Sequence, residues 1–114
     1  MKLDKFNKQS VEFNKKNLNG SDLQYAILHG SDLTGACLVG ANLYEAQLDG
    51  ADLSSANLTG ANLTGSDLSG ANLEGANLVG AYLSSANLKG TILTGAILTG
   101  HDLEYLRKRG AILS

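Results

Sequence analysis

The chain has 114 residues, 43% of them hydrophobic, with eleven acidic and nine basic side chains and a formal net charge of −2. This length corresponds to one domain, and the mean hydropathy of −0.05 fits a soluble protein with a thin core. No stretch approaches the roughly twenty apolar residues of a membrane span. The N-terminus lacks the apolar region of a secretory signal, and one cysteine excludes an internal disulfide. We therefore expect a cytoplasmic location.

The first fifteen residues precede the regular part of the chain and are expected to form an N-terminal cap with a partial coil (residues 1–15). Leu3 and Phe6 lie outside the repeat, whereas Val11 and Phe13 keep its register with bulkier side chains. We expect these four residues to cover the end of the stack, because an open end exposes leucines and unpaired strand edges. The alternative is that residues 1–8 are disordered.

Residues 16–103 form the body of the chain, in which a five-residue unit recurs around a central leucine. From Leu18 to Leu103 every fifth residue is leucine, and the residue two positions earlier is mostly Ala or Ser. Five residues advance an α-helix by about 500°, so the leucines would not share one stripe. An odd period also places successive leucines on opposite faces of a flat strand. The chain must therefore turn once in each unit.

The glycines show a second, longer period. All fourteen have residue numbers divisible by five, and every multiple of ten from Gly20 to Gly110 is glycine. The odd multiples of five also include other residues, such as Tyr25 and Ser55. We interpret the multiples of ten (the decade corners) as turns that need a positive φ, which glycine adopts freely, and the intervening corners as tolerant. This alternation predicts an even number of sides, and four sides with twenty residues per coil is the compact solution.

The unit, clearest at residues 56–80 (ANLTGANLTGSDLSGANLEGANLVG), resembles the A(D/N)LxG repeat of the pentapeptide-repeat family. The family fold is an all-β solenoid, the right-handed quadrilateral β-helix. The resemblance implies about five coils over residues 16–103, with Ala61 and Leu63 inside and Gly65 at a corner. The pattern is broken only near the ends of the chain, for example at His101.

A C-terminal cap is expected over residues 104–114. Residues 102–109 (DLEYLRKR) combine a helix N-cap residue, Asp102, with apolar residues at 103 and 106, basic residues in the last turn and a following glycine. These signals predict a short helix or an irregular turn that closes the stack. Residues 111–114 then return to the register and are expected to add a last partial side.

Taking every fourth unit gives four faces, and one of them carries all four tyrosines. Tyrosine combines a large contact area with a polar tip and is enriched at protein interfaces. We therefore predict that this face binds another protein, while the alternative is a chance column. We define the tyrosine face by its outward residues, which are Tyr25, Tyr44, Tyr82, Tyr105, Asp22, Glu45, Asp102 and Glu104.

Charge is segregated along the chain. Residues 17–105 contain nine acidic residues and one basic residue, which gives −8, while the segment at each end carries +3. Some members of the pentapeptide-repeat family are understood to act on DNA gyrase by mimicking DNA, so inhibition or protection of gyrase through the acidic barrel is the alternative function. However, seven of the twelve Asn and Asp residues that precede a leucine are neutral, and both residue types also hydrogen-bond locally at turns.

No constellation typical of catalysis or metal binding is found. His29 and His101 lie on different faces, no Cys/His spacing resembles a zinc site, and Cys37 lies outward without a nearby base in the sequence. A convex rod offers no cleft for a carboxylate pair. We therefore predict a non-enzymatic structural or protein-interaction module without catalytic residues, cofactor or metal, and without direct binding to nucleic acid or membrane. Isoleucines near the C-terminal end leave self-association open.

Overall fold

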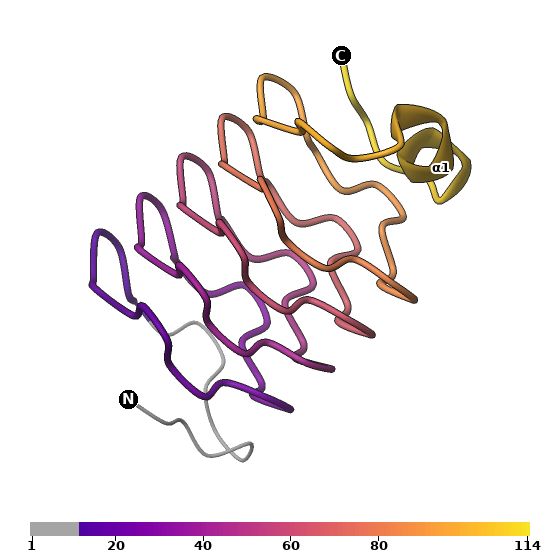
Figure 1. Ribbon diagram of the computed structural model, residues 1–114. Coiled ribbons are helices and arrows are strands. Elements are labelled where there is room, and N and C mark those ends of the chain that lie inside the picture. The colour runs from indigo at the N-terminus through magenta and orange to yellow at the C-terminus, as the bar shows by residue number, and fades with distance from the viewer. Residues whose placement is uncertain (1–11) are drawn as a thin grey trace.

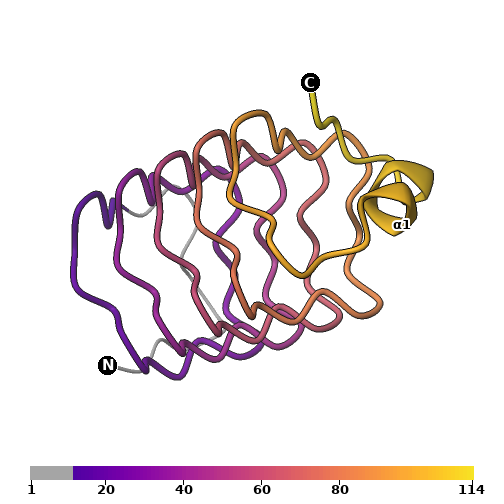
Figure 2. The same ribbon diagram turned by 45° about the horizontal axis from the view of Figure 1, so that its top comes forward.

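The computed structural model describes residues 12–114, which form a right-handed quadrilateral β-helix (Figures 1 and 2). The coils follow one another along the long axis, and helix α1 (Leu103–Lys108) lies at the C-terminal end. The molecule extends 34 Å along this axis and 20 and 19 Å across it. The predicted solenoid with a short helical cap is therefore confirmed. Of the expected N-terminal cap, Leu3, Phe6 and Val11 lie outside the described residues, whereas Phe13 packs partly buried against the core.

Parallel bridges join residues that are twenty apart, from residue 12 to residue 112. Each side contributes one bridge residue, the position before the leucine, so no extended strand occurs within residues 12–114. Three backbone hydrogen bonds link each side between residues 16 and 75 to the next coil. At the centre of the stack, Leu63 N donates to Tyr82 O (2.8 Å), Tyr82 N donates to Ala61 O (2.9 Å), and Gly65 N donates to Ser84 O (2.9 Å). The predicted coil of twenty residues is confirmed.

The interior is filled by the leucines and by the small residues two positions before them. Every repeat leucine from Leu23 to Leu78 is at most 1% exposed, and the alanines between them are equally buried. Buried hydroxyls are paired, because Ser66 Oγ donates to Leu63 O (2.8 Å) and Thr91 Oγ1 donates to Leu68 O (2.7 Å). Full burial of a leucine is worth roughly 1.5–3 kcal/mol. Because each coil buries these leucines only against its neighbours, stability depends on stacking.

The column of core leucines ends before the last leucine of the sequence period. Leu103 begins helix α1 and is 41% exposed, whereas Leu106, outside the period, is 1% exposed. Asp102 is the N-cap as predicted, since its Oδ1 accepts hydrogen bonds from Glu104 N (3.1 Å) and Tyr105 N (3.2 Å). The helix thus replaces a side of the β-helix and uses a different leucine to cover the core.

The cap also pairs with the backbone edge of the last complete coil. After the helix, Ile112 bridges to Ile92, so the predicted last partial side is confirmed. The Nε2–H of His101 donates to Leu78 O (2.7 Å), and the guanidinium of Arg109 donates to Ala86 O. These side chains bond carbonyls at the end of the stack, where no further coil follows within the described chain.

The corners differ from the prediction of two classes. Every glycine has φ between 61° and 97°, and the non-glycine corners also have positive φ, between 51° and 61°. All corners therefore adopt the left-handed conformation, and a side chain there costs about 1–2 kcal/mol. A Cβ built on Gly60 would meet no atom within 4 Å. Crowding explains the glycine at residue 110, where a Cβ would lie 3.0 Å from Cα of Lys89, but not the glycines at residues 20, 40, 50, 60, 70 and 100. The non-glycine corners are Lys15, Tyr25, Glu45, Ser55 and Ser85.

At some intervening corners, the side chain at the corner of one coil lies over the glycine at the corner of the next coil. A Cβ on Gly65 would lie 2.9 Å from Cγ of Glu45, the corner residue of the preceding coil. The same relation joins Gly35 to Lys15, at 3.4 Å from its Cγ. A long corner side chain therefore leans along the stack over the next coil, where glycine leaves room for it.

The burial of Leu63 predicts the effect of a charge in the core. Leu63→Arg should abolish folding, because an unpaired guanidinium would replace a side chain that is 0% exposed. Leu103→Arg is the matched control, since it alters a leucine of the same sequence period that is 41% exposed. Circular dichroism and thermal unfolding should show a folded control and an unfolded Leu63→Arg. Equal stability of the two variants would contradict the assignment of the core.

The common corner geometry predicts reciprocal effects of glycine and serine. Ser55→Gly should raise the free energy of unfolding, because glycine relieves the left-handed strain by more than it adds to the entropy of the unfolded chain. Gly60→Ser should lower it by a similar amount, about 1 kcal/mol. Chemical denaturation measures both changes. A loss at Gly60 several times larger than the gain at Ser55 would restore the two corner classes.

Candidate protein-binding face

The backbone register brings Tyr25 and Tyr44 into contact. Tyr25 is a corner residue with φ of 61°, and its N–H donates to the carbonyl of Tyr44 on the next coil (2.8 Å). The two rings meet edge to face, with centroids 5.7 Å apart and an interplanar angle of 87°. This is a favoured arrangement for aromatic pairs. Tyr25 is 47% exposed, so the pair presents aromatic surface to solvent.

Glu45 follows Tyr44 and acts on it electrostatically. The negative charge of Glu45 is the main cause that raises the pKa of Tyr44, and a hydrogen bond between their side chains adds to the shift. Within residues 12–114, no ion pair joins the Glu45 carboxylate to a basic side chain. Asp22 lies on the preceding coil, where its Oδ1 accepts a hydrogen bond from Gln24 N (3.3 Å). Tyr25, Tyr44 and Glu45 therefore form one cluster.

Tyr82 lies apart from this cluster. It occupies the bridge position opposite Asn62, on the second coil after the one that carries Tyr44. Adjacent coils are about 4.8 Å apart, so the backbones at Tyr82 and Tyr44 are separated by about 10 Å along the axis. Among residues 12–114, Tyr82 is the most exposed of the large apolar side chains, at 62%.

The three remaining residues of the tyrosine face belong to the cap. Asp102 caps helix α1, and Glu104 lies 3.9 Å from Lys108 on the same helix. The guanidinium carbon of Arg109 lies 5.7 Å from the ring centroid of Tyr105. The structure therefore divides the predicted face into the tyrosine–glutamate cluster, the isolated Tyr82 and a cap group whose polar side chains already have internal partners.

Five of the nine acidic residues between 17 and 105 have a structural role, four at coil corners and one at the start of helix α1. All twelve Asn and Asp residues before a leucine accept a hydrogen bond through Oδ1 from the backbone N–H two residues later, at 2.9–3.3 Å. These are Asx turns, which asparagine forms as well as aspartate. At Asp52, the hydroxyl of Ser54 also donates to Oδ1 (2.6 Å), and this bond is the main cause that lowers the pKa of Asp52.

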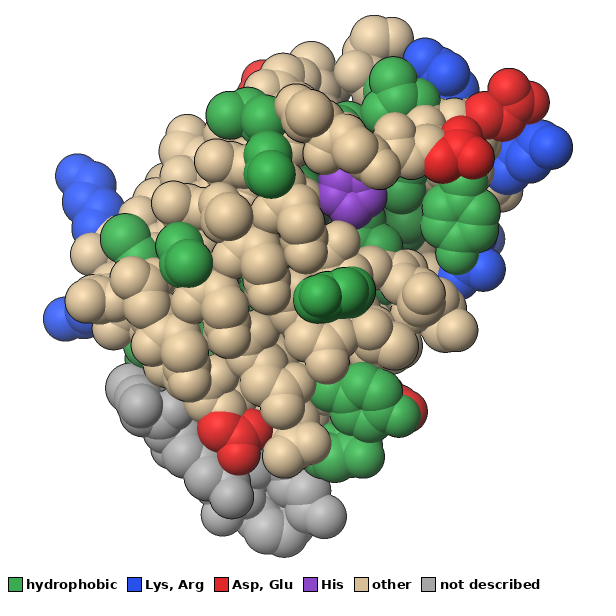
Figure 3. All heavy atoms as spheres, viewed as in Figure 1, with side chains coloured by type: hydrophobic (Ala, Val, Ile, Leu, Met, Phe, Trp, Pro, Cys, Tyr) green, Lys and Arg blue, Asp and Glu red, His purple; other side chains and the backbone are tan. Residues whose placement is uncertain are grey.

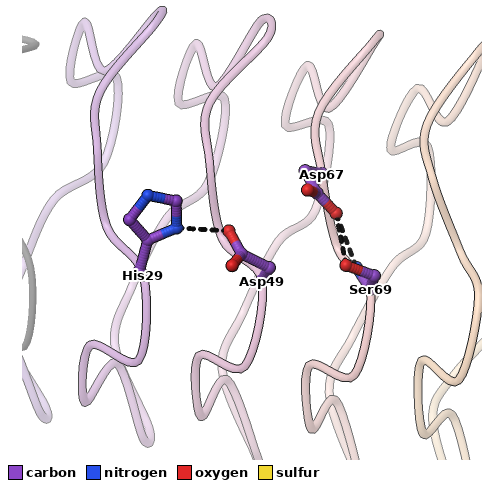
Figure 4. A network of polar contacts seen from close by, with 4 residues as sticks. All are labelled: His29, Asp49, Asp67 and Ser69. Atoms are coloured by element: carbon purple, nitrogen blue, oxygen red, sulfur yellow. Dashed lines mark hydrogen bonds and ion pairs between the residues drawn. The ribbon is translucent and has the colours of Figure 1, made fainter.

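Sequence reasoning missed a pair on another face. His29 Nδ1 and Asp49 Oδ1 are in hydrogen-bond contact, with both side chains about one-third exposed (Figure 4). Asp67 and Ser69 lie on the following coil, where Ser69 Oγ donates to Asp67 Oδ1 (2.6 Å). His29 and Asp49 are separated by one coil of twenty residues, and this spacing was the signal that could have revealed them.

Charged side chains gather toward the ends of the barrel on the side shown in Figure 3, and the middle of that side is largely uncharged. Among the described residues, no three His, Cys, Asp or Glu side chains are grouped so that they could hold a metal ion. Within residues 12–114, no helix has the length and apolar composition needed to cross a membrane.

Comparison with known families agrees with this repeat geometry. The sequence matches the family described as "Pentapeptide repeats", in eight copies over residues 9–40, 28–65, 36–75 and 61–100. The chain belongs to the pentapeptide-repeat family. Among the curated proteins, no match to this pentapeptide-repeat protein was found.

Two solved pentapeptide-repeat structures are similar over most of the chain. One, from the thylakoid lumen of Arabidopsis thaliana, has 35% identity and a TM-score of 0.81, and the match covers 90% of this chain and 77% of that one. The other, from Nostoc PCC 7120, has 39% identity and a TM-score of 0.79, with coverage of 90% and 84%. These structures support the right-handed β-helix and identify this pentapeptide-repeat protein as a structural repeat protein.

The contact between Tyr44 and Glu45 makes a prediction for titration. Glu45→Gln should lower the pKa of Tyr44 toward its ordinary value, because it removes the negative charge that disfavours the phenolate. Ultraviolet titration of the tyrosines, assigned with a Tyr44→Phe reference, measures this change. Glu74→Gln, on another face, should leave the titration unchanged. An unchanged Tyr44 titration in Glu45→Gln would contradict the contact.

Proposed function

We propose that this pentapeptide-repeat protein is a non-enzymatic interaction module that binds another protein through the tyrosine face. The observation that carries this proposal is the exposed, edge-to-face pair of Tyr25 and Tyr44. Tyr25 is 47% exposed and Tyr44 is partly exposed beside it, and aromatic rings of this kind supply the contacts that dominate protein interfaces. Tyr82, which is 62% exposed, lies apart from this pair on the same face and offers a second aromatic contact.

The scaffold favours such binding because it holds these rings in place before a partner arrives. The backbone on both sides of the tyrosine pair is hydrogen-bonded to neighbouring coils, and the leucines beneath it are buried. A partner would therefore spend little free energy on ordering the backbone of this face. Binding energy would come from the rings, with the surrounding polar side chains forming a rim.

The acidic surface by itself gives less support to an action on DNA gyrase. The Asx turns account for the aspartates before the leucines, and asparagine serves equally well there. We therefore treat gyrase as one specific partner to be tested. A supercoiling assay with excess protein measures this directly, and no change in supercoiling would remove gyrase as a target.

The proposed function predicts that binding depends on the tyrosines. Partners captured by the wild-type protein from native extract would be identified, and their affinities measured with purified components. The triple variant Tyr25→Ser, Tyr44→Ser and Tyr82→Ser should weaken binding by at least about tenfold, because it removes the central aromatic contacts.

The matched control is the double variant Val39→Ser and Val79→Ser, which alters one exposed and one partly exposed valine. Both lie on the face formed by residues 16–20, 36–40, 56–60, 76–80 and 96–100, which has no acidic residue. It should bind like the wild type, and thermal unfolding should show that both variants are folded. If every captured partner bound the tyrosine variant as tightly as the wild type, the tyrosine face would be the wrong surface.

A further inference from the structure

The cluster of Tyr25, Tyr44 and Glu45 combines two perpendicular aromatic rings with a carboxylate. We propose that this cluster binds a cationic side chain, an arginine or a lysine, on an exposed segment of the protein partner. The inference rests on the proposed function and adds the chemistry of the partner. Three features of the structure lead to it, namely the rings, the unpaired charge and the room made for Glu45.

The rings are suited to a cation because the face of an aromatic ring carries negative potential. An arginine or lysine within about 6 Å of a ring centroid is attracted to it. Tyr25 is 47% exposed, and Tyr44 is partly exposed beside it. Because the ring centroids are only 5.7 Å apart, a side chain that contacts the exposed surface of one ring lies near the other.

The charge of the cluster has no internal counterpart. The four sides of this face at 21–25, 41–45, 61–65 and 81–85 contain no lysine or arginine. Within the described chain, no ion pair is formed by Glu45. A basic side chain from a partner would therefore meet a carboxylate that is not already paired with another cation, and no basic neighbour on these sides would repel it.

In the C-terminal cap of the same protein, a tyrosine and a glutamate already contact basic side chains of the chain itself. There Arg109 lies over the ring of Tyr105 at 5.7 Å, and Lys108 lies 3.9 Å from Glu104. The cap thus combines one tyrosine and one glutamate with two cations. The Tyr25–Tyr44–Glu45 cluster has the same acceptor groups but lacks the cations, and this difference identifies the chemistry that a partner would supply.

The position of Glu45 depends on a glycine of the next coil. Its Cγ lies 2.9 Å from where a Cβ on residue 65 would be, so Gly65 leaves the space in which the Glu45 side chain lies. A methyl group there would displace the carboxylate. Gly60 has nearly the same φ, 68° against 70°, but a Cβ on it would meet no atom within 4 Å. The two glycines therefore form a matched pair, in which only one substitution should move Glu45.

The experiment uses the full chain and two synthetic peptides. One peptide is a capped glycine–serine chain with three arginines, and the other replaces each arginine by citrulline, which is neutral and similar in shape. Isothermal titration calorimetry at low salt should show binding of the arginine peptide at least about tenfold tighter than that of the citrulline peptide. Absence of binding by the arginine peptide, or equal binding of the two, would overturn the inference.

Variants locate the binding. Glu45→Gln and the double variant Tyr25→Ser with Tyr44→Ser should each weaken arginine-peptide binding by about threefold or more. Gly65→Ala should weaken it more than Gly60→Ala, while Glu74→Gln should have little effect. If Glu74→Gln weakened binding as much as Glu45→Gln, the attraction would be a general effect of the acidic barrel and the inference would be wrong.

The inference and the proposed function can fail separately. A natural partner whose affinity falls in the triple tyrosine variant but not in Glu45→Gln would support the proposed function and overturn the cationic contact. Specific arginine-peptide binding that depends on Glu45 and the tyrosine pair supports the cationic contact, even when every captured protein binds independently of the tyrosines. In that second case the proposed function fails and the cluster is a site for cationic side chains alone.

Discussion

Backbone hydrogen bonds between adjacent coils, which bridge residues twenty apart, are the constraint on which the rest of this structure depends. They fix four sides of five residues, and this places every repeat leucine and every small residue two before it inside. The same register decides which outward side chains are neighbours. Tyr25 meets Tyr44 and His29 meets Asp49 because the hydrogen-bonded coils set these residues side by side. Core and surface contacts thus follow from a single backbone repeat.

The architecture could be predicted from the sequence because its signal is repeated in almost every unit. A leucine period of five excludes an α-helix and a flat strand, and the glycine spacing indicates an even number of sides, of which four is the compact solution. The local departures were harder to read. Leu103 keeps the period but lies in a helix, since the capping signal at Asp102 is stronger there than the repeat. The corners were misread because composition shows which residues are tolerated, whereas φ is positive at Tyr25 and Ser55 as well as at glycine.

The candidate site was predicted as a face, and the structure resolves it into parts. Sequence position alone placed Tyr105 in the same column as Tyr25, but the helix gives it an arginine neighbour of its own. The contact between Tyr25 and Tyr44 depends on a corner residue of one coil lying beside the residue after the leucine in the next. The twenty-residue register determines that these two residues are neighbours. The orientation of the rings and the position of Glu45 depend on side-chain packing, which no repeat pattern specifies.

Because of the Asx turns, the surface charge of this protein can change without the loss of the hydrogen bonds that stabilise its corners. Asparagine and aspartate offer the same Oδ1 to the corner N–H, so exchanging them preserves the turn while changing the charge by one unit. Twelve such positions are distributed over the barrel. Such exchanges could therefore make the surface less acidic or more strongly acidic, one substitution at a time, while each turn is kept. In this fold, the surface charge that a partner would meet can change while the backbone scaffold stays the same.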